Sequence, residues 1–454
     1  MLTALSAYGL IIVVLCWFYR PRASYEDFVV GDKSSGWLIT AFGLFTLIGG
    51  GELVAGATFG YVFGWAGVAL FVGYGISFVL LALLSPRVLS DAVPGTVTYV
   101  DYAHQKYGST VGGIVLLSHL FPFFALLVLQ LSAGGHVISQ LSSVSYFGSV
   151  LLCASLICLY LFIGGFRAVM VTDLVQGIVM AFLVLVAVYA AYGILSPASA
   201  ELPSAGFESP DFDAFWGVMI SGVVIGLASA DVWQRVFAAK SSNAARAGFI
   251  IGGVLLAAYG GLIVYLGILS KVTGLTTNPE SAYLSVLQSA LPAPLFAVAI
   301  FGTLAAILST ADTEVFLVSS LLDRGHRQWI EKRAPWAEES GKERRFGRGF
   351  IVAIVALACV GAYWGSDLAL LFHWMFVAYM VFAPTIAMSV IFPLSRNMML
   401  LSFALTAATF VLLLFADILT LGNSYILTLP VVLISLYFAF FRTTKNRSNH
   451  GKPY

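Results

Sequence analysis

A short stretch of the chain places several hydroxyl and carboxylate side chains inside otherwise apolar sequence. Within residues 305–314 these are Ser309, Thr310, Asp312, Thr313 and Glu314. On a helix, Ser309 and Thr313 share one face, as do Thr310 and Glu314 on the next. A lone hydroxyl in a membrane helix commonly bonds to the preceding turn of its own backbone. Several together favour a different interpretation, because hydroxyls and backbone carbonyls freed at a helix break suit a dehydrated sodium ion.

A second group of candidate residues follows a glycine cluster. Gly49, Gly50 and Gly51 lie midway along the apolar stretch 37–63 and are followed directly by Glu52. Glycine clusters inside a membrane span are tolerated where the backbone lines a cavity or packs closely against a neighbour. The alternatives are therefore a helix break at a binding site, or a close helix contact with Glu52 protonated or paired. The cost of keeping a carboxylate inside a membrane favours the binding site.

A similar interruption occurs in the stretch 214–234, which contains Gly222, Gly226 and the polar run Ser229-Ala230-Asp231. Paired interruptions in two halves of a hydropathy pattern indicate an inverted repeat with its binding site at the breaks. The candidate solute-binding residues are accordingly Gly49, Gly50, Gly51, Glu52 and Asp231.

The other ionisable groups in apolar sequence are isolated. Asp173 follows a cytoplasmic turn predicted at 164–167 and is interpreted either as an interfacial residue or as a functional carboxylate. Single histidines on apolar faces predict packing residues, with solute contact or proton transfer as the alternative; they are His119, His136 and His373. The four cysteines lie in apolar segments, which is typical of small buried hydrophobes and not of a disulfide or metal framework.

The elements that must position these residues are membrane helices. The chain is 60% hydrophobic and 10% charged, whereas a soluble domain carries about a quarter charged residues. Several apolar stretches reach the ~20 residues that cross a bilayer core. We predict thirteen spans, near 3–19, 37–63, 65–86, 110–133, 146–163, 168–194, 214–234, 247–270, 292–321, 349–364, 367–392, 398–416 and 423–441.

The basic residues predict the orientation. With the N-terminus outside and the C-terminus cytoplasmic, 22 of the 23 Lys and Arg residues fall in cytoplasmic loops, and only Lys271 is outside. Residues 1–454 then form one transmembrane domain with a leading helix at 3–19, core repeats at about 37–194 and 214–392, and trailing helices at 398–441. Arg235 is assigned to a cytoplasmic loop, and the charged run 323–348 to a solvated one, with lipid binding as the alternative.

No Lys or Arg is left at membrane depth in this assignment. A strongly anionic solute would therefore lack a side-chain cation, whereas Glu52 and Asp231 favour a solute with an amine or many hydroxyls. A net charge of +1 does not favour nucleic acid as a partner.

Five motifs, in order, resemble those of the sodium:solute symporter family, which includes bacterial proline, pantothenate, sialic acid and sugar symporters and the animal sodium/glucose cotransporters. The similar segments are 25–33, Gly60-Tyr61 with Gly64, 164–168 with Thr172-Asp173 and Gln176-Gly177, Trp233-Gln234-Arg235 with 238–241 and Arg246, and 305–312.

The resemblance implies an all-α, LeuT-like core of two inverted five-helix repeats, with sodium as the coupling ion and no organic cofactor. By motif position it implies sodium ligands at Phe45, Ile48, Ala306, Ser309 and Thr310. Asp173 matches an aspartate that assists sodium release, and some members bind a further sodium between that aspartate and the positions of Asp312 and Thr313. Asp312 departs from those members, which carry a hydroxyl there, so a proton is the alternative at this place.

The expected function is sodium-coupled import of a small polar organic solute, amino-acid-like or amine-bearing, by a monomer in the lipid bilayer of the plasma membrane. The alternatives are a membrane sensor on the same fold, for which the thirteen-residue tail after Phe441 is short, and a proton-coupled symporter. An enzyme is not expected, because no nucleophile–base pair or metal-ligand spacing is present in the sequence.

Overall fold

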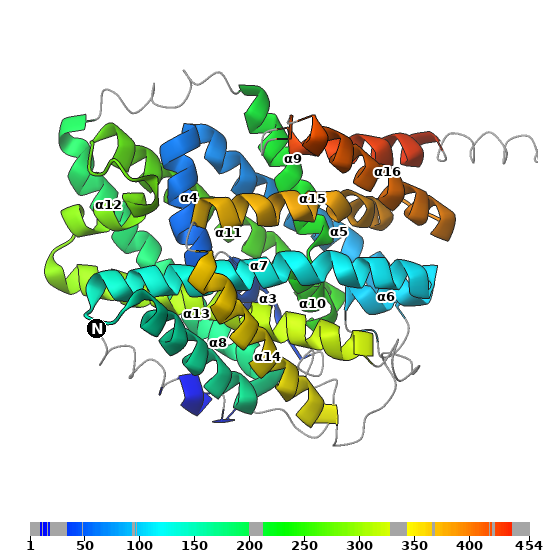
Figure 1. The fold of residues 1–454 in the computed structure, drawn as a ribbon, viewed down its shortest axis with the longest axis horizontal. Coiled ribbons are helices and arrows are strands. Elements are labelled where there is room, and N and C mark those ends of the chain that lie inside the picture. Colours follow the sequence, from blue (N-terminus) through cyan, green and yellow to red (C-terminus); the bar gives the residue numbers. More distant parts are fainter. Residues whose placement is uncertain are drawn as a thin grey trace, which may run out of the picture.

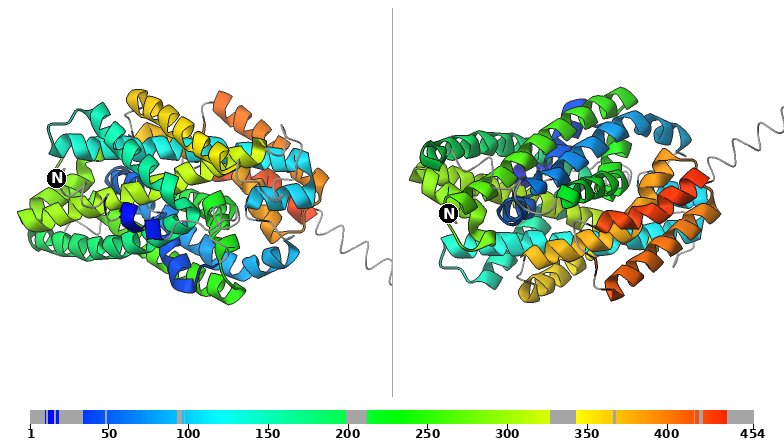
Figure 2. Two further views of the ribbon diagram at one scale, coloured as in Figure 1. Left: turned by 90° about the horizontal axis from the view of Figure 1, so that it is seen from below. Right: turned by 90° about the horizontal axis from the view of Figure 1, so that it is seen from above.

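The computed structural model describes residues 10, 12–15, 17–18, 34–47, 49–92, 96, 98–198, 212–326, 343–365, 368–416, 418–419 and 423–437. This described part consists of helices and their connections. An isolated parallel β-bridge joins Ser35 to Ala239. The helices α7 (Ser109–Leu141) and α15 (Leu368–Ile391) lie side by side along the molecule (Figure 1). Figure 2 shows the whole helical arrangement from below and from above.

The first broken helix contains the glycine cluster. Helix α3 (Trp37–Phe45) ends before the cluster, and α4 (Gly50–Phe63) begins within it, with Gly49 as the N-cap residue. After α4, a 3-10 turn, η2 (Gly64–Gly67), leads into α5 (Val68–Asp91). This turn starts at a φ of 58° at Gly64, a left-handed conformation that glycine adopts without steric cost. The predicted interruption at the glycine cluster is confirmed.

The second broken helix lies in the stretch 214–234. Helices α9 (Phe212–Ala228) and α10 (Ala230–Ala238) are bent by 46° at Ser229, whose backbone is extended. The indole N–H of Trp233 donates to the carbonyl of Leu227 at 2.8 Å, which satisfies one of the carbonyls left without a helical partner at the end of α9. This interruption is also confirmed, and the two breaks stand at the starts of the two predicted repeats.

The remaining long helices cover predicted stretches, with α8 running through two of them, and two short helices, α6 and α12, lie between predicted stretches. Their bounds are α6 (Tyr99–Tyr107), α8 (Tyr146–Ala198), α11 (Ser242–Val272), α12 (Ala282–Ala290), α13 (Ala293–Gly325), α14 (Glu343–Trp364), α16 (Arg396–Phe415) and the apolar segment Ser424–Tyr437. The prediction of a turn at 164–167 is wrong, because the backbone stays helical throughout α8. Adjacent glycines permit a turn but do not impose one, because glycine also adopts helical dihedral angles.

Several of these helices have the length and apolarity of membrane spans. Four described helices (α7, α11, α13 and α16) and the continuous run Glu52–Asp91 through α4, η2 and α5 qualify, and α9 with α10 qualifies as a sixth, bent span. Helix α16 leaves most of its apolar surface uncovered, with Leu412 and Phe415 exposed by 70% and 86%. Water does not favour such a surface, whereas lipid does. The described helices are those of a multi-pass membrane protein, and the count of thirteen spans stays a prediction.

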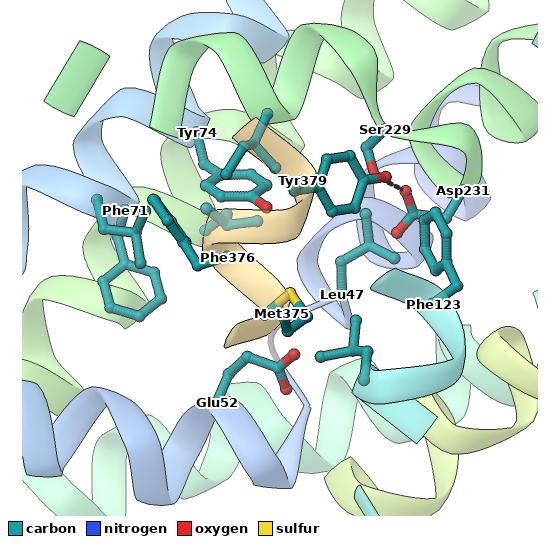
Figure 3. Close-up of a pocket in the computed structure, with 14 residues that line it drawn as sticks. Leu47, Glu52, Phe71, Tyr74, Phe123, Ser229, Asp231, Met375, Phe376 and Tyr379 are labelled. Carbon is teal, nitrogen blue, oxygen red and sulfur yellow. Dashed lines mark hydrogen bonds between the residues drawn. The ribbon is translucent and has the colours of Figure 1, made fainter. Parts of the chain in front are cut away.

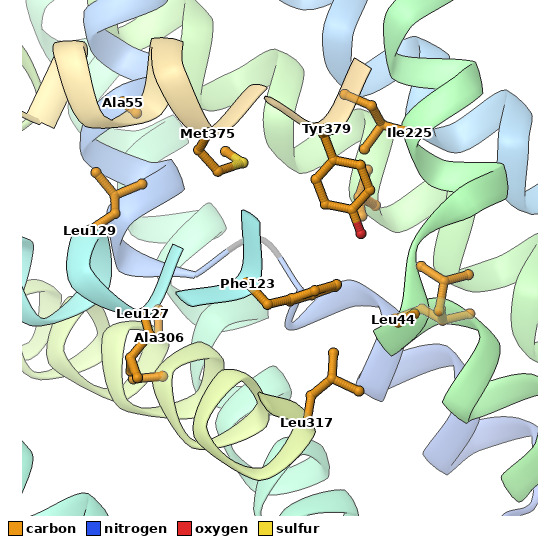
Figure 4. Close-up of a cluster of buried hydrophobic side chains, with 14 of the residues drawn as sticks. Leu44, Ala55, Phe123, Leu127, Leu129, Ile225, Ala306, Leu317, Met375 and Tyr379 are labelled. Carbon is orange, nitrogen blue, oxygen red and sulfur yellow. The ribbon is translucent and has the colours of Figure 1, made fainter. Parts of the chain in front are cut away.

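Two helices hold the first break in place. Helix α11 packs against α3, α4 and α5, and α13 packs against α7 and α8. A Cβ on Gly267 of α11 would lie 1.8 Å from the carbonyl oxygen of Ala57, so only glycine allows this approach to α4. Figure 4 shows Leu44 of α3, Phe123 of α7 and Leu317 of α13 pointing into the same core. The end of α3 is thereby fixed beside the polar stretch of α13.

Candidate functional site

Buried oxygen atoms gather where α3 breaks beside α13. The hydroxyl oxygen of Thr310 lies 3.1 Å from the backbone carbonyl oxygen of Thr46 and 3.3 Å from that of Ala306, and its single proton is shared between these two acceptors. Thr46 is the C-cap residue of α3, where backbone carbonyls lose their helical partners. All three residues are at most 2% exposed. Hard cations prefer such oxygen ligands, so the cluster can hold sodium.

Ser309 joins the same cluster to Asp173 on α8. Its hydroxyl donates to one carboxylate oxygen of Asp173 at 2.8 Å, and Arg235 of α10 donates to the other at 3.0 Å. All three side chains are buried. Because the proton of Ser309 points to Asp173, the lone pairs of its oxygen are free to accept a cation. Asp173 thus orients the Ser309 hydroxyl of the cluster and is itself held by the Arg235 guanidinium.

The buried position of Arg235 corrects the sequence interpretation. Arg235 was assigned to a cytoplasmic loop, yet it lies in α10, is 1% exposed and also donates to the backbone carbonyl of Asp231 at 3.2 Å. The basic run 323–348 begins in the same way, since Arg324 lies in α13, is 1% exposed and bonds to Asp101 of α6. Counting charges by loop does not reveal a partner supplied by a distant helix.

The structure places the other predicted ion residues as follows. Phe45 is the last residue of α3, and its ring lies 5.1 Å from that of Tyr259. Ile48 lies outside the described residues. Thr313 and Asp312 are buried on α13, with the Thr313 hydroxyl 3.5 Å from an Asp312 carboxylate oxygen. A further ion site at Asp312 and Thr313 stays a prediction.

A cavity lies next to the two helix breaks. The cavity, whose lining side chains are drawn in Figure 3, has a volume of about 70 Å³. The lining combines two carboxylates with an aromatic and aliphatic wall: Leu47, Glu52, Leu70, Phe71, Tyr74, Phe123, Leu126, Ile225, Ser229, Asp231, Leu256, Met375, Phe376 and Tyr379. The sequence paired Glu52 with Asp231, and the structure brings both to this cavity.

Each carboxylate of the cavity is held by neutral hydrogen-bond donors. Glu52 of α4 accepts from the side-chain amide of Gln130 at 2.7 Å. Asp231 of α10 accepts from the Ser229 hydroxyl and from the backbone N–H of Val232, the latter at 2.7 Å. Neutral donors fix the position of a carboxylate without cancelling its charge. The cavity therefore holds two carboxyl groups in defined places, and none of its lining residues is a lysine or arginine.

The glycines of the first break have a spatial role. A Cβ on Gly49 would lie 2.0 Å from the Thr310 hydroxyl oxygen, so this glycine lets the break approach the oxygen cluster. Gly50 and Gly51 form the first turn of α4, ahead of Glu52. The sequence did not single out Gln130, Tyr74 or Tyr379. Gln130 carries the one usable signal, a polar side chain within an apolar helix.

Two broken helices, an oxygen cluster at one break and an enclosed cavity beside both are the features of a secondary transporter. The chain belongs to the sodium:solute symporter family, whose model matches residues 28–408. It is 27% identical to a sodium/pantothenate symporter of Haemophilus influenzae over 68% of this chain and 67% of that protein. It is 30% identical to a high-affinity choline transporter of Caenorhabditis elegans over 37% of this chain and 31% of that protein.

A solved structure shows the fold. A substrate-bound, outward-open sodium-coupled sialic acid symporter superposes with a TM-score of 0.80 over 95% of both chains, at 12% identity. The protein is thus a multi-pass membrane transporter in which sodium is the coupling ion and a small molecule is the cargo.

Proposed function

We propose that the protein imports a small, amine-bearing organic cation together with sodium by alternating access. The observation that carries this proposal is the cavity in which Glu52 and Asp231 face an aromatic wall. Carboxylates attract an ammonium group, and the faces of aromatic rings attract it as well, most strongly when water is excluded. The wall contains Tyr74, Tyr379 and Phe123, whose rings supply such faces.

The charge of the cavity supports a cation over an anion or a zwitterion. An anionic group would lie near Glu52 and Asp231 without a lysine or arginine among the lining residues. Burying a charge without a partner costs several kcal/mol, which few interactions of a small solute can offset. The partial match to a choline transporter agrees with an ammonium-bearing solute.

We place sodium at the oxygen cluster formed by Thr46, Ala306, Ser309 and Thr310, with Asp173 orienting Ser309. This placement adds Thr46 to the residues implied by family resemblance. Sodium there would join the end of α3 to α13. Because Gly49 packs against Thr310 and Glu52 lies three residues further on, this joining would fix the start of α4 and thereby Glu52. Sodium binding would thus increase solute affinity.

The energetics are adequate for accumulation. One charge moved across 100 mV provides ~2.3 kcal/mol, and 1.4 kcal/mol is about a factor of ten. A single sodium therefore supports roughly 50-fold accumulation of a neutral solute from voltage alone. The full site lies within one chain, so we expect the monomer to transport.

The test is radiolabelled uptake into proteoliposomes with and without an inward sodium gradient. Choline, proline, pantothenate and a sialic acid are the solutes. We expect sodium-dependent accumulation of choline or another ammonium compound, and none of pantothenate. Accumulation without sodium would contradict the coupling. Binding without accumulation would favour a sensor on the same fold, and uptake of only anionic solutes would overturn the assignment of the cavity.

The sodium site has its own variants. Thr310→Val and Ser309→Ala each remove an oxygen ligand, so we expect the sodium concentration for half-maximal uptake to rise at least about tenfold. Ser320→Ala is the matched control, because the Ser320 hydroxyl lies on the same helix, is buried and bonds only to the Leu317 carbonyl of its own helix at 2.8 Å. An equal effect of the control would show that the loss is structural.

A further inference from the structure

His119 on α7 lies against the second helix break. It is fully buried, and its Nε2 lies 3.0 Å from the carbonyl oxygen of Ala228, the last residue of α9. Its Nδ1 lies 2.6 Å from the carbonyl oxygen of Val115 in its own helix. Carbonyl oxygens only accept hydrogen bonds. Each ring nitrogen therefore faces an acceptor.

A neutral imidazole cannot satisfy this geometry. It carries one N–H, so the lone pair of its other nitrogen would point at a carbonyl oxygen. Ser118 does not relieve the conflict: its hydroxyl donates to the Val115 carbonyl at 2.7 Å and lies 3.4 Å from Nδ1. The hydroxyl has one proton, and that proton is used at Val115. The imidazolium form, with an N–H on each nitrogen, donates to both carbonyls.

Two features of the surroundings act in favour of a positive charge on the ring. The C-terminus of a helix carries partial negative charge, and Ala228 ends α9 at the break. Asp231, three residues further on in α10, acts on His119 as an opposite charge. Burial is the largest electrostatic influence on the ring and acts against the charge, so the case for the imidazolium rests on its two carbonyl contacts, which the helix end and Asp231 support.

In the described part of the chain, the other titratable groups near the ring come from several helices. On α15, the ring of Tyr379 lies 6.2 Å from His119 and its hydroxyl lies 3.3 Å from that of Ser229. Tyr74 on α5 and Glu314 on α13 interact electrostatically with Tyr379. Glu52 on α4 interacts with Asp231, and Arg235 on α10 is paired with Asp173.

We propose that His119 is a protonation site that holds the break between α9 and α10 and so makes solute binding depend on pH. It is a positioning residue, since it acts through Ala228 and the adjacent Ser229 and Asp231 of the cavity. When the imidazolium loses a proton, the bare nitrogen turns a lone pair toward a carbonyl, and the ring must leave one of its two partners. Sodium remains the coupling ion. The inference rests on the proposed function only in its second test, which measures transport.

The first test does not depend on transport. Nitrogen-15 NMR of the histidine side chains in the detergent-solubilised protein distinguishes imidazolium from neutral imidazole. We expect one histidine to carry protons on both nitrogens at neutral pH, and this signal to vanish in His119→Gln but persist in His136→Gln. His136 is the matched control, because it lies on the same helix and packs on Tyr146. A His119 signal with one bare nitrogen between pH 5 and pH 9 would overturn the proposal.

The second test is the KM for choline, whose charge does not titrate, measured by sodium-driven uptake across the same pH range. We expect the wild-type KM to rise about fivefold as His119 deprotonates, with a smaller change in kcat. His119→Gln keeps an uncharged donor for Ala228 at every pH, so its KM should be independent of pH, and His119→Asn is the second variant should Gln not fold. A wild-type pH profile in His119→Gln would overturn the proposal. If choline is not transported, the solute assignment fails, and the NMR titration still decides the role of His119.

Discussion

Asp173 and Arg235 connect the oxygen cluster on α13 to the second broken helix by hydrogen bonds. Asp173 holds Ser309 of the oxygen cluster with one oxygen and Arg235 of α10 with the other. Arg235 in turn bonds to the backbone of Asp231, which lines the cavity. A continuous set of hydrogen bonds thus runs from the oxygen cluster to the cavity, the places proposed for sodium and solute. Such a connection gives each site a physical means of responding to the other.

Removing one member of this pair should destabilise the protein. Breaking a buried ion pair leaves an uncompensated charge and costs about 3–5 kcal/mol. We expect Asp173→Asn and Arg235→Gln each to lower the melting temperature in detergent, and the double variant to lose less than the sum of the two. Asp91→Asn is the control, since its pair with Lys106 is 3.6 Å long and exposed, and exposed pairs contribute at most about 1 kcal/mol. Additive losses would mean that the two residues are not coupled.

At the scale of elements, the first break depends on the absence of a side chain. A Cβ at Gly49 would meet the Thr310 hydroxyl at 2.0 Å, so Gly49→Ala should push the start of α4 away from α13. We expect sodium-dependent uptake to fall at least tenfold, roughly the effect of losing a ligand. The measurement is initial uptake rate against sodium concentration. Gly261→Ala is the matched control, because its added Cβ would meet Val68 of α5 at an ordinary 3.8 Å. Normal uptake by Gly49→Ala would place the sodium site elsewhere.

A second element-scale prediction concerns the docking of α6. Thr98 and Asp101 form a capping box at its start, and Asp101 also pairs with the buried Arg324 of α13. Arg324→Gln should therefore break the ion pair that joins α6 to α13 and remove a cation from beside the buried Asp101, at a cost of about 3 kcal/mol. Hydrogen exchange of α6 amides should rise. Unchanged exchange would show that the capping box and the packing of α6 on α7 hold this helix without the ion pair.

The breaks were predictable from sequence and the cavity wall was not. Glycines 49–51 and the run Ser229-Ala230-Asp231 mark their breaks because backbone flexibility and polar groups are local properties. Tyr74, Phe123 and Tyr379 come from three helices, and nothing in their local sequence places them together. Arg235 was missed for the same reason, since its partner Asp173 lies 62 residues away. Local patterns predict interruptions, whereas tertiary packing decides which side chains meet.

For the whole molecule, the proposed solute and ion sites fix how many charges cross the membrane in a cycle. One sodium with a monovalent cation moves about two charges, which is ~4.6 kcal/mol per 100 mV. That supports accumulation on the order of 10³-fold from voltage alone, compared with roughly 50-fold for a neutral solute. The charge per solute therefore separates an organic cation from a zwitterion.

We expect a ratio of about two charges per transported solute when current and tracer uptake are measured in the same voltage-controlled proteoliposomes. A ratio near one would mean an uncharged or zwitterionic solute, and the roles of Glu52 and Asp231 would have to be revised. A ratio near three would favour a further cation at Asp312 and Thr313. Parallel uptake of radioactive sodium separates a sodium ion from a proton at that place, because only sodium raises the sodium count per solute. Asp312→Asn should then return the ratio to two without changing solute selectivity, since Asp312 is not among the cavity-lining residues.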